Sequence, residues 1–176
     1  MGLLLAFAPF VVFAILSHVT APTLALVAAG LTSLLLVGRE IVAGRSAKTL
    51  EVGTSALFFG LGALSFLGII GWTVIGVKLA VDSGLFLIVL FSIARGTPFT
   101  IEYARESAPE SVWANPRFLQ TNRVISVVWL LALGAVAIAD LILLCAPAVP
   151  HNISVLLTVF ALYAAFRFTK TYPERN

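Results

Sequence analysis

Residues 73–94 read TVIGVKLAVDSGLFLIVLFSIA, a stretch of 22 residues whose only charged side chains are Lys78 and Asp82. A helix needs about 20 predominantly apolar residues, with a range of roughly 17–25, to cross the hydrocarbon of a bilayer. At ~1.5 Å per residue, this stretch is long enough as a helix to reach across that layer. It therefore predicts a transmembrane α-helix.

Five further apolar stretches lie on either side of it. They cover residues 3–19 (with a kink expected at Pro9), 23–38, 52–70, 124–146 and 153–168. The first two are short and closely linked, so they form either a full hairpin or a re-entrant pair. We expect an all-α fold: a polytopic transmembrane helical bundle of about six helices, built as three consecutive hairpins. Residues 1–176 would form a single transmembrane domain.

Composition supports this placement. The chain has 176 residues, of which 60% are hydrophobic and only 11% are charged, whereas a soluble domain carries about 25% charged residues. A single soluble core of this size could not bury so much apolar surface. A bilayer removes the problem, because it solvates apolar side chains directly. The lipid bilayer is thus the first partner that the sequence implies.

The basic residues fall on one side of the predicted bundle. That side holds ten of the eleven Lys and Arg residues: Arg39, Arg45, Lys48, Arg95, Arg105, Arg117, Arg123, Arg167, Lys170 and Arg175. The links 17–22, 70–73 and 147–152 on the other side contain none. Since positive charge marks the cytoplasmic side, we expect both termini and the loops 39–50 and 95–122 in the cytosol. We attribute the net charge of +3 to basic residues that lie next to anionic lipid headgroups. We do not expect nucleic acid as a partner.

Three charged side chains are predicted to lie within the hydrocarbon, where each costs at least about 2.5–3.5 kcal/mol. Lys78 and Asp82 share a face of one helix because they are four residues apart. Lys78 and Asp140 would both lie ~9 Å from the outer end of their helices. We expect Lys78 to bridge Asp82, Asp140 or both. The layer is either an ion, proton or substrate path, or a buried ion pair that fixes helix packing.

The loop 95–122 is the most informative polar segment. Its aromatic and aliphatic residues Phe99, Ile101, Tyr103, Trp113, Phe118 and Leu119 alternate with the charged residues Glu102, Arg105, Glu106, Glu110 and Arg117. Such a stretch is typical of the headgroup level, with its aromatic rings turned inward. It is either an interfacial connector or a platform that binds a partner or lipid headgroups. Its candidate contact residues are Glu102, Tyr103, Arg105, Glu106, Trp113 and Arg117.

The sequence holds no nucleophile elbow, phosphate-binding glycine loop, zinc-protease motif or complete acid–base motif. Cys145 is the only cysteine, so an internal disulfide and a cysteine-rich metal site are excluded. We therefore assign no catalytic residue, and we expect neither a cofactor nor a metal.

Several short motifs resemble a known family. They are Phe7-Ala8-Pro9-Phe10, the basic loop leading into Thr49-Leu50-Glu51, Gly96-Thr-Pro-Phe, Pro109-Glu-Ser-Val-Trp113, and then Asn122 and Trp129. Together they resemble the intracellular septation protein A family of bacterial inner-membrane proteins. The gap from Trp113 to Asn122 is longer than in that family's pattern and the loop holds extra acidic residues, so a sister family is the alternative. The resemblance spans most of the chain. It implies a non-enzymatic role in cell-envelope synthesis and septation, through contacts with other membrane proteins.

Two other classes stay open. One is a small transporter or channel, working as a homo-oligomer, that uses Lys78, Asp82 and Asp140. The other is an intramembrane enzyme that acts on a lipid or isoprenoid, with Asp82 or Asp140 as its acid.

Overall fold

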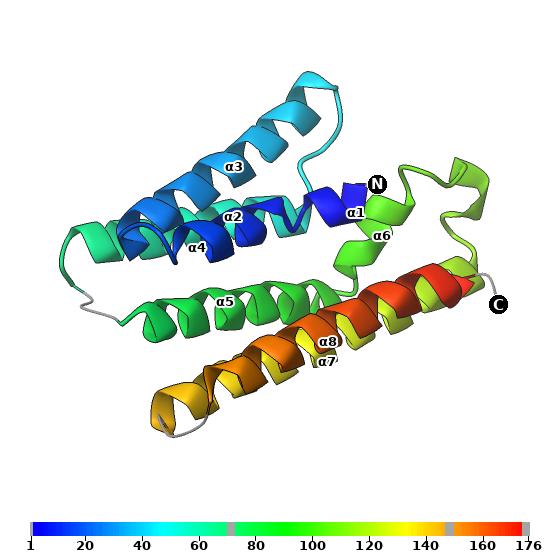
Figure 1. Cartoon of the computed structure of the whole chain (residues 1–176). Helices are drawn as coiled ribbons and strands as arrows, with labels where there is room; N and C mark the ends of the chain where they lie inside the picture. Colours follow the sequence, from blue (N-terminus) through cyan, green and yellow to red (C-terminus); the bar gives the residue numbers. More distant parts are fainter. Residues whose placement is uncertain (1, 70–72, 147–149, 174–176) are drawn as a thin grey trace. The chain divides into compact units, whose positions relative to one another are not determined.

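The computed structural model describes residues 2–69, 73–146 and 150–173 (Figure 1). Within them the chain is helical and has no strand, which confirms the all-α prediction. Its elements are α1 (Gly2–Leu5), α2 (Ala8–Leu16), α3 (Pro22–Val42), α4 (Thr49–Phe66), α5 (Val74–Ala94), α6 (Phe99–Ala104), the 3-10 turn η1 (Glu110–Val112), α7 (Pro116–Cys145) and α8 (His151–Thr171). Residues 70–72 and 147–149 of two expected links, and Arg175, lie outside the described residues.

Among the described residues, five helices are long and apolar enough to cross a membrane. They are α3, α4, α5, α7 and residues 152–171 of α8. The first expected span is shorter, because the apolar stretch Leu3–Leu16 is divided between α1 and α2. The break falls at Ala6 and Phe7, just ahead of Pro9. Proline lacks a backbone N–H and its ring clashes with the preceding turn, which accounts for the break.

The chain forms two compact units, Met1–Val81 and Asp82–Asn176, whose boundary falls inside α5. In the first unit α2 packs on α3, and α3 packs on α4. The buried core residues are Phe13, Ala25, Leu26, Ala29, Phe58, Val77 and Val81. Phe58 is fully buried, with its ring centroid 5.1 Å from that of Phe10 and 5.8 Å from that of Phe13. The small residues Ala25 and Ala29 allow helices to approach closely.

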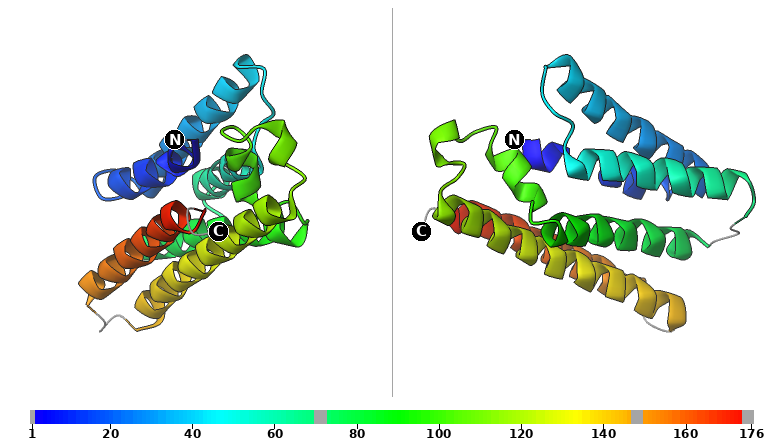
Figure 2. Two further views of the ribbon diagram at one scale, coloured as in Figure 1. Left: turned by 90° about the vertical axis from the view of Figure 1, so that its right-hand side faces the viewer. Right: turned by 180° about the vertical axis from the view of Figure 1, so that it is seen from behind.

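In the second unit α7 and α8 form a hairpin, and α6 lies against α7 (Figures 1 and 2). The Trp129 Nε1–H of α7 donates to Thr169 Oγ1 of α8 at 2.9 Å, which ties the middle of α7 to the last turn of α8. The end of α5, the start of α7 and the end of α8 point toward the same end of the unit (Figure 1).

The start of α7 corrects a predicted boundary. The fifth apolar stretch was expected to become helical near residue 124, but α7 begins at Pro116. Asn115 caps it, accepting a hydrogen bond from the Arg117 backbone N–H at 2.9 Å, and proline is favoured at the first helical position. The first two turns of α7 interrupt their apolar residues with Arg117, Gln120 and Asn122, so a search for a continuous apolar stretch could not reveal them.

Candidate functional site

The three predicted intramembrane charges lie on two helices. Lys78 and Asp82 are half-buried and one turn apart on α5. Asp140 on α7 is fully buried, and the Ser154 hydroxyl of α8 donates to its Oδ1 at 3.5 Å. Asp140 therefore takes part in the packing of the α7–α8 hairpin. Pairing of Lys78 with Asp82 or Asp140 stays a prediction.

The loop 95–122 has an ordered first part, because buried hydrogen bonds hold α6 against α5 and α7. The Thr100 hydroxyl donates to the Asn122 carbonyl at 2.8 Å and lies 2.8 Å from the Ser126 hydroxyl. Thr100 has a single hydroxyl proton, so Ser126 must donate in the second contact. The Phe99 backbone N–H donates to Ser92 Oγ of α5 at 3.2 Å. The start of the loop is thereby fixed to both α5 and α7.

The candidate contact residues of this loop divide by burial. Tyr103 is buried on α6, Glu102 and Trp113 are half-buried, and Arg105, Glu106 and Arg117 are exposed. The Arg105 guanidinium lies over the Trp113 ring, 5.1 Å from its centroid. The Trp113 Nε1–H donates to the Ala108 carbonyl at 3.1 Å. Trp113 thus organises the turn, while Arg105, Glu106 and Arg117 stay exposed.

The anchoring of α6 can be tested with Thr100→Val. The variant removes the hydroxyl that serves both Asn122 and Ser126, and leaving buried polar groups unsatisfied costs about 1–3 kcal/mol. We expect faster amide hydrogen exchange in residues 99–104, with little change in α8. Thr171→Val is a matched control, because that hydroxyl bonds only within its own helix, to the Arg167 carbonyl. Equal exchange in the two variants would contradict the anchoring.

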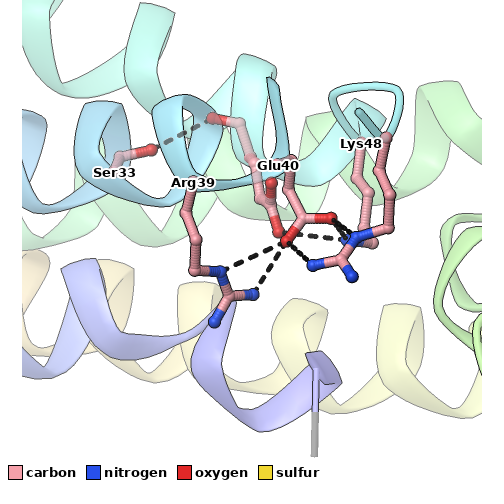
Figure 3. A network of polar contacts seen from close by, with 6 residues as sticks. Ser33, Arg39, Glu40 and Lys48 are labelled. Carbon is pink, nitrogen blue, oxygen red and sulfur yellow. Dashed lines mark hydrogen bonds and ion pairs between the residues drawn. The ribbon is translucent and has the colours of Figure 1, made fainter. Parts of the chain in front are cut away.

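A second polar cluster, which sequence reasoning missed, surrounds Glu40 near the end of α3 (Figure 3). The Glu40 carboxylate is fully buried and contacts three cations: Arg39 Nη2 at 2.8 Å, Arg45 Nε at 2.8 Å and Lys48 Nζ at 2.7 Å. The Lys48 ammonium is also buried and lies 3.7 Å from Glu51 Oε1. Close, hydrogen-bonded cations are what makes a buried carboxylate tolerable.

The turn after α3 brings these groups together. Gly44 has φ +69°, and the Arg45 backbone N–H donates to the Glu40 carbonyl at 2.9 Å. A glycine in this left-handed conformation is a common helix end, because it has no Cβ to clash. The chain then folds back, so Arg45 and Lys48 reach the carboxylate from the loop.

Next to the Glu40 cluster, serine hydroxyls connect α3 and α4. Ser33 Oγ of α3 donates to the Glu51 carbonyl of α4 at 3.0 Å (Figure 3). It also lies 2.8 Å from Ser55 Oγ. The Glu40 cluster and these contacts together fix the α3–α4 hairpin at its basic end.

Chemically, the Glu40 cluster is suited to holding structure rather than to catalysis. Its carboxylate is engaged by three cations, so it has little capacity to exchange protons. The Arg39 and Arg45 side chains remain 45% and 50% exposed and can face polar groups outside. Sequence reasoning assigned Arg39, Arg45 and Lys48 to membrane orientation alone. The overlooked signal was Glu40, an acidic residue within a basic loop.

Within the described part of the chain, no group of three or more His, Cys, Asp or Glu side chains could hold a metal ion. The residues that the structure describes form an all-α fold with five helices long and apolar enough to cross a membrane. No protein-family model, curated protein or solved structure matches the chain.

Proposed function

We propose that this chain is a non-enzymatic, multi-pass protein of the bacterial cytoplasmic membrane. In this proposal it supports cell-envelope and septum biogenesis, and the loop 95–122 binds other membrane proteins. One observation carries the proposal: the loop is anchored by buried hydrogen bonds through Thr100. A plain connector between two helices needs no such anchoring, whereas a binding surface gains from being preorganised.

The distribution of charge supports a cytoplasmic position for this loop. Arg95 follows α5, Arg117 and Arg123 lie in the first turns of α7, and Arg167 and Lys170 lie near the end of α8. In the first unit, Arg39, Arg45 and Lys48 flank the α3–α4 turn. Basic residues next to membrane-spanning helices favour the cytoplasmic side, so both termini are proposed to lie there.

The role in envelope and septum synthesis rests on the resemblance of the short motifs to septation protein A. Two of those motifs, Gly96-Thr-Pro-Phe and Pro109-Glu-Ser-Val-Trp113, lie in the loop that α6 and η1 organise. Phe99 is buried beside Ser92, and Trp113 stacks with Arg105. The resembling residues thus support the shape of the proposed binding surface.

A charge swap on the loop tests this function. Glu110 and Arg117 are both exposed, and Glu110→Lys with Arg117→Glu reverses the local charge pattern at constant net charge. Like charges facing each other across an interface cost several kcal/mol, so partner binding should weaken by more than about tenfold. In bacterial cells that lack the protein, we expect wild type to restore normal cell length and septum placement, and the swapped variant to fail.

The matched control keeps the sign of both charges, with Glu110→Asp and Arg117→Lys, and should restore division. Membrane levels of the three proteins are compared by immunoblot, so that loss of function is separated from loss of protein. Normal division with the swapped variant, at wild-type levels, would contradict the proposed role of the loop.

A further inference from the structure

A pocket with a volume of about 860 Å³ lies within the second unit, between the end of α5, α6 and the first turns of α7. Ile93 of α5 and Ile101 of α6 form apolar walls, and Val127 of α7 extends the apolar lining. Gln120 and Arg123 of α7 supply polar side chains. Pockets for small molecules usually measure about 300–1,000 Å³ and combine apolar walls with a few polar groups.

Among the described residues, Arg123 is the only charged one that lines this pocket. It is exposed and has no ion pair or hydrogen-bonding side chain among the described residues. The described lining residues include no carboxylate, so an anionic group in the pocket would meet the attraction of Arg123. A guanidinium also matches the geometry of a phosphate, which it can bind through two parallel N–H groups.

The polar and apolar parts of the pocket are ordered along α7. Gln120 and Arg123 lie nearer the start of the helix, and Val127 lies one turn further in, ~6 Å along the axis. The start of α7 is the polar, basic end of this long helix, whereas its later turns are apolar enough for the bilayer interior. Polar groups at headgroup level with apolar groups just below match the layering of a phospholipid.

The pocket is formed by the fold of the loop itself. Gly96 has φ +78°, a conformation that glycine adopts without strain, and it turns the chain from α5 toward α6. The buried hydrogen bonds of Thr100 then hold α6 against α7. The walls therefore exist before any ligand arrives, which lowers the entropy lost on binding.

We propose that this pocket binds one anionic phospholipid of the surrounding bilayer. The phosphate contacts Arg123 and Gln120, and the upper part of an acyl chain lies against Ile93, Ile101 and Val127. The site does not depend on the proposed role in division, because Glu110 and Arg117 do not line the pocket.

The test uses the purified full chain in mild detergent, titrated with phosphatidylglycerol or with phosphatidylcholine and followed by native mass spectrometry. We expect one phosphatidylglycerol to bind in preference to phosphatidylcholine. Arg123→Gln should weaken phosphatidylglycerol binding about five- to tenfold, as expected for loss of one basic residue at a headgroup. Because Arg123 is exposed and has no ion-pair partner among the described residues, this variant should fold normally.

Two further variants test whether phosphatidylglycerol binds in the pocket or is attracted by exposed basic residues in general. Arg117→Gln, on the same helix but outside the pocket, should change binding less than about twofold, because this side chain does not line the pocket and salt screens exposed charges that make no direct contact. Val127→Trp should weaken binding with all charges intact, because it fills the apolar part. Equal effects of the two arginine variants, unchanged binding to Val127→Trp, or no preference over phosphatidylcholine would overturn the proposal.

A competition experiment distinguishes a lipid site from a simple phosphate site. Inorganic phosphate and glycerol phosphate carry the anionic group without acyl chains. We expect neither to displace phosphatidylglycerol, even at a hundredfold excess. Displacement by either compound would identify a free-phosphate site and overturn the assignment to lipid.

Discussion

Glu40→Gln is expected to lower the free energy of unfolding by about 3 kcal/mol. The substitution removes a fully buried carboxylate that contacts Arg39, Arg45 and Lys48. Removing one partner of a buried ion pair usually costs about 3–5 kcal/mol, because the other charge stays buried. The Lys48 side chain is only 5% exposed, but Glu51 lies 3.7 Å away and offsets part of its charge. The lower end of the range is therefore expected.

The loss is measured by reversible unfolding in mixed micelles. Glu110→Gln is the matched control, because it makes the same substitution at an exposed position. We expect it to change the free energy of unfolding by no more than about 0.5 kcal/mol. A Glu40→Gln variant as stable as Glu110→Gln would show that the cluster contributes no stability.

The membrane-spanning helices could largely be predicted from the sequence. Residues 73–94 were expected to form a helix, and α5 covers Val74–Ala94. Lipid requires a long, continuous apolar stretch, so composition alone locates such a helix. The polar start of α7 at Pro116 was missed for the same reason: helical turns outside the hydrocarbon need no apolar side chains. The division between α1 and α2 depends on local backbone geometry ahead of Pro9.

The candidate sites could be predicted only in part. Asp140 was identified because a charge inside an apolar stretch stands out, and the structure places it in a buried position. The Glu40 cluster was not identified, because α3 ends at Val42 and Lys48 reaches Glu40 from the start of α4 rather than from the same helix. Their contact depends on the turn at Gly44, whose positive φ is a property of the folded backbone. The pocket beside Arg123 depends likewise on how α6 packs.

Phe58→Ala is expected to lower the free energy of unfolding by about 3–5 kcal/mol, the usual loss for truncating a buried aromatic side chain. Phe58 is fully buried, and its ring packs against those of Phe10 and Phe13 of α2. Its removal leaves a cavity where the ring packs, between α2, α3 and α4. The same unfolding assay in mixed micelles measures the loss.

Phe66→Ala is the matched control for Phe58→Ala, because it truncates an exposed phenylalanine instead of a buried one. Phe66 lies on the same helix, α4, but is 82% exposed in the structure. In a bilayer or micelle, an exposed ring contacts apolar chains in both the folded and the unfolded state, because lipid tails are as apolar as the side chain. Its truncation should therefore change stability by less than about 0.5 kcal/mol. A loss as large as that of Phe58→Ala would mean that Phe66 is packed against protein, and that α4 does not present this face to lipid.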